Sequence, residues 1–154
     1  MSIFQKLFGF TGRIRRSDWW LFSILLAVVE VVIRIAVRAA TGTLAEGANP
    51  TSTSGVVADG LVSLVFFWPS LALSVKRLHD RRKSGWLMFL PIILGFALGC
   101  YAVAGVSPTA SPPLPFIIIV ILVGVVGLWL FVELGILDGA PGPNKYGPSP
   151  KAPG

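Results

Sequence analysis

The sequence predicts an all-α membrane protein, a transmembrane bundle of four helices preceded by a short amphipathic helix. The first observation is composition: 54% of the 154 residues are hydrophobic and only 13% are charged, with a mean hydropathy of +0.78. A soluble domain of this length carries about twice that share of charged residues. The second observation is a set of four apolar runs. The third is that the basic residues outside these runs lie before the first run, between the second and third, and after the fourth.

The four apolar runs define the expected spans. A hydrocarbon core about 30 Å thick needs about 20 apolar residues of helix. Runs of that length cover residues 19–40, 56–75, 86–106 and 116–137, and they leave 138–154 as a polar tail. The first run exceeds the usual apolar core of a signal peptide, about 7–15 residues, so we expect it to be retained as a span. The whole chain, 1–154, then forms a single membrane domain.

The basic residues predict the orientation of these spans. Eleven Lys and Arg precede the first run, separate the second from the third, or follow the fourth, whereas residues 41–55 and 107–115 contain none. Cytoplasmic loops carry such an excess of basic residues, so we expect both termini in the cytoplasm. Cations beside spans meet anionic headgroups, which accounts for most of the net charge of +6. Without an aromatic stacking pattern or a recognition fold, the basic clusters argue against a nucleic-acid partner.

The residues before the first span predict a short amphipathic helix in the membrane interface. Its apolar side chains recur at helical spacing beside Lys6: Ile3, Phe4, Leu7 and Phe8. Gly9 and Gly12 are expected to end this helix. Aromatic anchors are expected where two spans begin on the cytoplasmic side: Trp19, Trp20 and Trp86.

Three polar segments are expected on one side of the membrane: FTGRIRRSDWW (10–20), VKRLHDRRKSGW (75–86) and GAPGPNKYGPSP (139–150). In this order, separated by apolar runs, they resemble the bacterial inner-membrane family known as domain of unknown function 805 (DUF805), over essentially the whole chain. The resemblance implies a multi-pass inner-membrane protein whose activity is unassigned, and it supplies no catalytic residues. Ser149 stands where the family often has an acid and Ala140 where Thr is frequent, which predicts a tail that docks less firmly.

The candidate site is a basic cytoplasmic face built from these segments: Arg13, Arg15, Arg16, His79, Asp80, Arg81, Arg82, Lys83, Asn144 and Tyr146. Guanidinium groups suit phosphate and carboxylate partners. The favoured function is therefore binding of anionic lipid headgroups, or of a protein partner or a second copy of the chain. Depth along the membrane normal predicts that Glu133 pairs with the hairpin between the second and third spans, through Arg77. Residues 81–83 then have no comparable acid partner except Asp80 and are expected to meet a ligand.

The adjacent His79 and Asp80 allow two interpretations. The first is a general base oriented by a carboxylate, but neighbouring residues on a helix point about 100° apart. The second is that Asp80 forms ion pairs with nearby cations, among Lys76, Arg77 and Lys83. One histidine and a lone Cys100 supply too few ligands for a metal site and no intrachain disulfide. We therefore expect no cofactor, and a membrane-embedded enzyme is the least favoured function.

Charged residues inside the expected spans form a second candidate site. Glu30, Arg34 and Arg38 share one face of the first span, and Glu133 lies near the cytoplasmic end of the fourth. A charge at the bilayer centre costs about 2.5–3.5 kcal/mol on insertion scales, so such residues are either paired or functional. One interpretation is a ladder in which Glu30 pairs with Arg34 while Arg38 extends to the outer interface. The other is a path for a small solute, an ion or a proton.

Overall fold

The computed structural model describes residues 2–46, 52–103 and 112–151. The elements in this part of the chain are helical: α1 (Ile3–Phe8), α2 (Arg16–Ala40), η1 (Leu44–Glu46), α3 (Thr53–Asp80), η2 (Gly85–Met88), α4 (Phe89–Val103), α5 (Leu114–Phe131) and η3 (Val132–Ile136). The prediction of an all-α protein with a short N-terminal helix is confirmed. The end of the third expected span, 104–106, lies outside the described residues.

Within the described part of the chain, three helices are long and apolar enough to cross a membrane: α2, α3, and α5 continued by η3. The fourth apolar segment, Gly85–Tyr101, is helical but shorter. The helices also extend beyond the apolar runs. In particular, α3 continues through Asp80, five residues past the end of the expected span, because backbone hydrogen bonding does not stop at the edge of the hydrocarbon.

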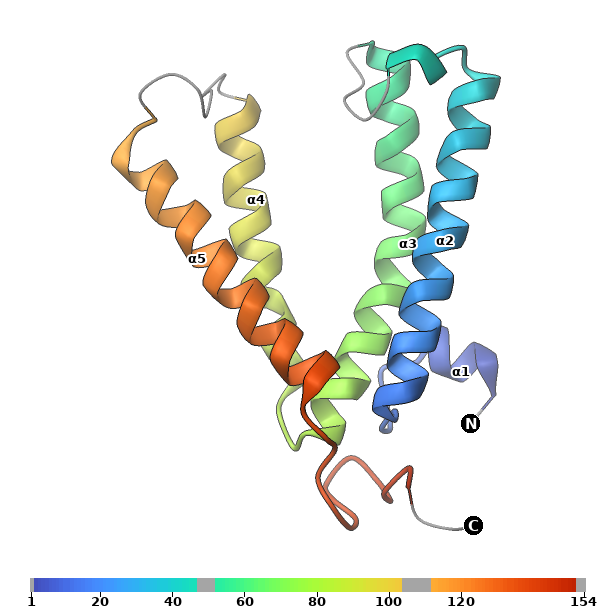
Figure 1. Ribbon diagram of the computed structural model, residues 1–154, viewed down its shortest axis with the longest axis vertical. Helices are drawn as coiled ribbons and strands as arrows, with labels where there is room; N and C mark the ends of the chain where they lie inside the picture. The colour runs from blue at the N-terminus through green and yellow to red at the C-terminus, as the bar shows by residue number, and fades with distance from the viewer. Residues whose placement is uncertain (1, 47–51, 104–111, 152–154) are drawn as a thin grey trace.

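The long helices form two pairs rather than the single bundle of four that was expected. α2 packs along α3 and α4 packs along α5, and the pairs diverge from one end of the molecule (Figure 1). The pairs touch each other mainly through the short elements η2 and η3. Lipid tails are as apolar as the helix faces, so hydrophobic burial does not close a bundle, and polar contacts decide where helices meet.

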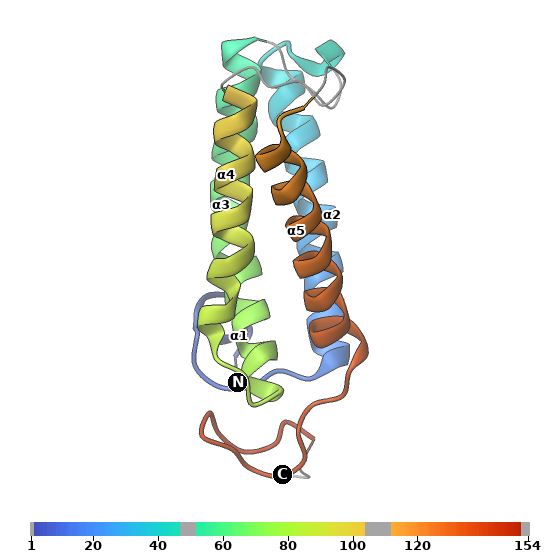
Figure 2. The ribbon, with the colours of Figure 1, turned by 90° about the vertical axis from the view of Figure 1, so that its left-hand side faces the viewer.

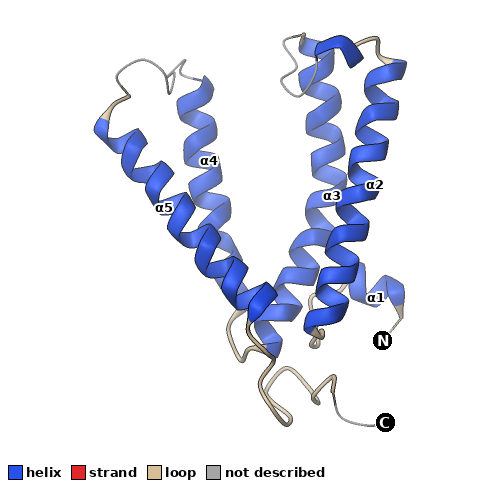
Figure 3. Ribbon diagram, in the orientation of Figure 1, coloured by secondary structure: helices blue, strands red, loops and turns tan. Residues whose placement is uncertain are grey.

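The end where the pairs meet is called the basic end below. It contains α1 with the arm leading to α2, the hairpin between α3 and η2, and the tail 138–151 (Figure 3). Seen from the side, the tail crosses beneath the helices (Figure 2). The first and last described segments of the chain therefore lie together at one end.

The packing inverts that of a soluble protein. The largest fully buried side chains include two cations, Arg77 and Lys76, whereas large apolar side chains are exposed along α2, α3, α4 and α5. The hydrophobic cluster of Leu78, Leu130 and Leu134 also lies near the basic end, where α3 meets α5 and η3. An apolar exterior around buried charges fits helices surrounded by lipid.

Candidate functional site at the basic end

Asp80, the last residue of α3, is the hub of the basic end. Its Oδ1 accepts a hydrogen bond from Arg13 Nε at 2.9 Å and lies 2.9 Å from Arg13 Nη2. Its Oδ2 pairs with Arg77 Nη1. Two guanidinium groups thus compensate one buried carboxylate. Its main-chain oxygen accepts from Ala140 N at 2.8 Å, so Asp80 connects the N-terminal arm, α3 and the tail.

Arg13 holds the tail through main-chain oxygens. Its Nη2 donates to Ala140 O at 2.6 Å and its Nη1 to Gly142 O at 2.7 Å. A Cβ at Gly139 would lie 1.9 Å from Asp80 Oδ2, so a side chain has no room there. Ser149, which stands where related proteins often have an acid, takes part in none of these contacts. Its presence therefore removes none of the contacts that hold the tail to Arg13 and Asp80.

Arg77 ties α3 to the end of α5. It is fully buried, and its Nε donates to Leu134 O at 2.9 Å while its Nη2 donates to Leu137 O. The wider π-helical turn η3 leaves such oxygens available to a side chain. The expected ion pair between Arg77 and Glu133 is therefore wrong. Asp80 lies one helical turn from Arg77 on the same helix, and that closer acid takes the guanidinium.

Glu133 pairs instead with the hairpin that follows α3. Its Oε1 lies 2.8 Å from Lys83 Nζ and its Oε2 lies 3.2 Å from Arg81 Nε. Arg81 also donates to Asp138 O. The expected pairing of Glu133 with the hairpin is confirmed, but through Arg81 and Lys83, which were expected to have no acid partner other than Asp80. Arg82 has a left-handed backbone with φ of 62°, and its exposed side chain donates to Pro141 O at 3.2 Å.

Lys76 anchors α1. Its ammonium is fully buried and donates to three main-chain oxygens at the end of α1: those of Gln5, Lys6 and Gly9. The last carbonyls of a helix lack partners within the helix and carry its negative dipole, so a cation is favourable there. The sequence analysis considered Lys76 only as a possible partner of Asp80 and missed this role.

Asn144 and Tyr146, the two tail residues of the candidate site, both contact His79. The imidazole stacks on Tyr146, with ring centroids 3.7 Å apart and planes at 8°. Asn144 Nδ2 donates to His79 O at 2.9 Å, and His79 Nδ1 lies 3.3 Å from Gly12 O. Of the two interpretations of His79 and Asp80, the ion-paired one is confirmed for Arg77. Arg13, which was not expected, is the second partner of Asp80, and Lys76 and Lys83 bind elsewhere.

Arg15 and Arg16 border an open cavity of about 410 Å³, together with Ser17, Asp138 and Lys151. The first turn of α2, which starts there, has no side-chain cap. Lys151 Nζ lies 3.3 Å from Asp138 Oδ1, and Arg16 Nη2 lies 3.8 Å from it. The hydrogen bond and charge of Lys151, followed by the charge of Arg16, hold the pKa of Asp138 below its usual value. Three cations thus face one acid.

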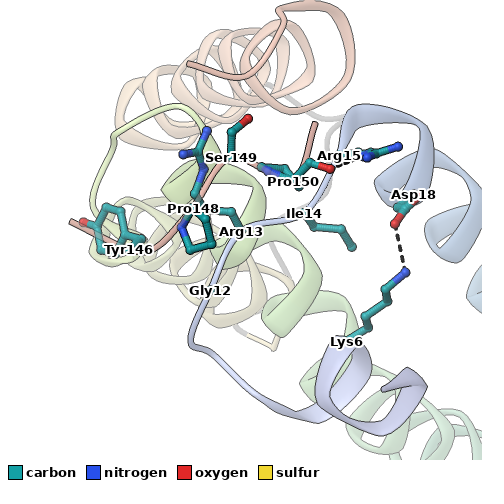
Figure 4. A pocket seen from close by; sticks show the side chains of 10 residues that line it. All are labelled: Lys6, Gly12, Arg13, Ile14, Arg15, Asp18, Tyr146, Pro148, Ser149 and Pro150. Atoms are coloured by element: carbon teal, nitrogen blue, oxygen red, sulfur yellow. Dashed lines mark hydrogen bonds and ion pairs between the residues drawn. The ribbon is translucent and has the colours of Figure 1, made fainter. Parts of the chain in front are cut away.

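A neighbouring cavity of about 450 Å³ separates the arm from the tail (Figure 4). Arg15 borders both cavities and donates to Pro150 O. On the far side, Lys6 Nζ pairs with Asp18 Oδ2 at 2.9 Å. The remaining walls include apolar Ile14 and Pro148. Arg15 is therefore the cation shared by these two cavities.

The charges inside the spans form a cluster between α2 and α3. Glu30 Oε1 lies 2.6 Å from Arg34 Nη2, which confirms the expected pair. Asp59 on α3 lies 3.2 Å from Arg34 Nη1 and also pairs with Arg38, whose side chain is 9% exposed. Arg38, which was expected to extend to the outer interface, lies in the last turn of α2 and pairs with Asp59. Asp59 was overlooked within an apolar run, although one acid against two arginines already called for a second acid.

Metal binding finds no support in the described part of the chain, where no three His, Cys, Asp or Glu side chains gather into a site. Cys100, the only cysteine of the sequence, is exposed on α4.

Comparison with known proteins places most of the basic end, from residue 7 to residue 148, within a recognised family region. The model of the family described as "Protein of unknown function (DUF805)" matches residues 7–148. "Uncharacterized protein YiiR" of Escherichia coli (strain K12) is 35% identical over 151 residues, covering 96% of this chain and 89% of that protein. "Inner membrane protein YhaI" of the same strain is 34% identical over 96 residues, covering 60% and 72%. "Inner membrane protein YhaH" is 23% identical over 151 residues, covering 98% and 94%. No solved structure shows significant similarity to the chain.

Proposed function

This chain belongs to the DUF805 family of membrane proteins of unknown function, and from that premise we propose that its basic end binds anionic lipid headgroups of the inner membrane. Four spans with both termini in the cytoplasm are part of this proposal. The excess of Lys and Arg around the basic end supports that orientation, since residues 41–55 and 107–115 contain none. The headgroups would then be those of the cytoplasmic leaflet.

The observation that carries the proposal is the cavity at the start of α2. Arg15, Arg16 and Lys151 surround it, and only Asp138 offsets their charge. The uncapped first turn of α2 adds amide donors and the positive end of the helix dipole. A phosphate group matches this combination, since guanidinium forks and helix N-termini both bind its oxygens.

The height of the cavity also suits a headgroup. Trp19 and Trp20 follow in the next turn of α2, and indole rings at the ends of spans lie at the level of the headgroups. The hairpin fits the role less well, because Arg81 and Lys83 are already paired with Glu133. The proposed site is therefore the beginning of α2, not the hairpin.

The experiment is native mass spectrometry of the protein released from nanodiscs containing phosphatidylglycerol and phosphatidylcholine. In the Arg15→Gln/Lys151→Gln variant, retained phosphatidylglycerol should fall several-fold relative to the parent. Arg16 is left unchanged because it also donates to Ile136 O and so supports the fold. A higher salt concentration should also lower the amount of phosphatidylglycerol that the parent retains, because salt screens the attraction.

The matched control is Arg82→Gln/Lys145→Gln, which removes the same charge from two exposed positions of the same end. This variant should retain nearly as much phosphatidylglycerol as the parent. Equal losses in both variants would show diffuse attraction to the basic end rather than a site. A parent that retains no preference for phosphatidylglycerol would refute the proposal altogether.

A further inference from the structure

A third cavity at the basic end has a different chemistry. It measures about 530 Å³ and lies beside α3 and η2, away from the start of α2. Its aromatic walls are formed by Phe10, Trp68, Trp86, Phe89 and Tyr146, and no Lys, Arg, Asp or Glu lines it. Its volume falls in the range of small-molecule sites, about 300–1,000 Å³. The space therefore suits an apolar ligand, not an anion.

Two aromatic pairs form much of the wall of this cavity. Phe10 meets Trp68 edge to face with centroids 5.0 Å apart, and Trp68 is held by donating to Phe8 O at 3.3 Å. Trp86 stacks on Phe89 with centroids 4.9 Å apart. Trp68 is 51% and Trp86 76% exposed, so internal packing leaves much of both rings available. Such faces favour stacking or edge contacts with another planar ring.

His79 supplies one polar atom in this apolar surface. Its Nδ1 lies 3.3 Å from Gly12 O, and because a carbonyl only accepts, Nδ1 carries the proton of the neutral ring. Nε2 is then an acceptor, and no donor among the described residues reaches it. A Cβ at Gly85 would lie 3.3 Å from Nε2, which places this nitrogen at a residue that lines the cavity. The stack on Tyr146 fixes the ring in that position.

We propose that this cavity binds a planar, largely apolar molecule with one hydroxyl group, a phenol in the simplest case. The ring lies between the aromatic walls, and the hydroxyl donates to His79 Nε2. A saturated acyl chain could fill the same space, but it would leave Nε2 without a donor. Trp68, Trp86 and Phe89 are exposed on the surface next to the spans, so the ligand enters from the membrane rather than from water.

The test uses naphthol and its methyl ether, which share the ring but differ in the hydroxyl donor. The protein carries fluorotryptophan, sits in phosphatidylcholine nanodiscs at about pH 8, where an ordinary imidazole is neutral, and is observed by fluorine NMR. Single Trp→Phe variants assign the resonances. Naphthol should shift those of Trp68 and Trp86 saturably and bind about fivefold more tightly than the ether, as one neutral hydrogen bond gives. The other three tryptophans are internal controls.

The matched variant is His79→Phe, which keeps a ring against Tyr146 and removes the acceptor. It should bind the ether as the parent does and lose the preference for naphthol. The proposal would be overturned if the parent bound both compounds equally, or if the resonances of all five tryptophans shifted in parallel. Both outcomes are measured on the parent, so they do not depend on whether His79→Phe folds. Because the Arg15→Gln/Lys151→Gln variant leaves this cavity intact, it should bind naphthol normally, so the two proposals fail separately.

Discussion

Arg13 Nη2 lies 2.9 Å from Asp80 Oδ1, and the two side chains are only 1% and 3% exposed. The pair joins residues 67 positions apart, one before the first long helix and one at the end of the second. Both charges are removed from water, so each needs the other as its countercharge. Removing one partner therefore costs more free energy of unfolding than the intact pair contributes.

Asp80→Asn should destabilise the protein severely. The substitution leaves Arg13 and Arg77 buried without a countercharge, which costs about 3–5 kcal/mol for a buried pair that loses one partner. Thermal unfolding in detergent, followed by tryptophan fluorescence, measures the change. Asp138→Asn removes an exposed acid and should change stability by less than about 1 kcal/mol. Similar losses in the two variants would show that Asp80 is not a buried hub.

Gly139→Ala should release the tail. The new Cβ would lie 1.9 Å from Asp80 Oδ2, and one of them has to move, at a cost of about 1–3 kcal/mol for overpacking. Limited trypsin digestion detects the release as faster cleavage after Lys145. The control is Gly124→Ala in α5, where an added Cβ meets nothing within 4 Å. If both variants resist trypsin like the parent, the tail does not depend on this close approach.

Arg34→Leu should destabilise more than Glu30→Leu/Arg34→Leu, by about 1 kcal/mol or more. The single change leaves Glu30 without the partner now 2.6 Å away, whereas the double change leaves no unpaired charge on α2. Asp59 keeps its contact with Arg38 in both variants. Melting temperatures in one detergent provide the comparison. Equal losses would mean that Glu30 and Arg34 do not interact.

Asp138 should titrate below the usual range of an aspartate. Lys151, and then Arg16, stabilise its ionised form, so the folded pKa lies below the unfolded value. Its contribution to tail docking is therefore complete above the unfolded pKa, about 3.9, and is lost as pH falls through the lower folded pKa. The carboxyl carbon-13 shift reports this titration. Lys151→Gln and high salt should each raise the apparent pKa; an unchanged value in both would exclude the ion pair.

The helices could be predicted from the sequence, whereas the partners of most charges could not. An apolar run in lipid has almost no alternative to a helix, so residues 19–40 and 116–137 lie close to α2 and to α5 with η3. Depth along the membrane normal can also be estimated from the sequence. The rotation of each helix about its axis cannot, and that rotation directs Arg77 to Leu134 O and Glu133 to Lys83. Asp59 illustrates the same limit, since its arginine partners belong to another helix.

The contacts of Arg13 have a consequence for biosynthesis. This side chain leaves the ribosome well before the oxygens that it binds, since Ala140 and Gly142 are made 127 and 129 residues later. The helices can be inserted one after another during translation, but the site around Asp80 is completed only after the tail has been synthesised. A nascent chain halted before Gly139 would therefore contain the helices but lack the tail contacts of Arg13 and Asp80, so the tail would dock after the helices have been made.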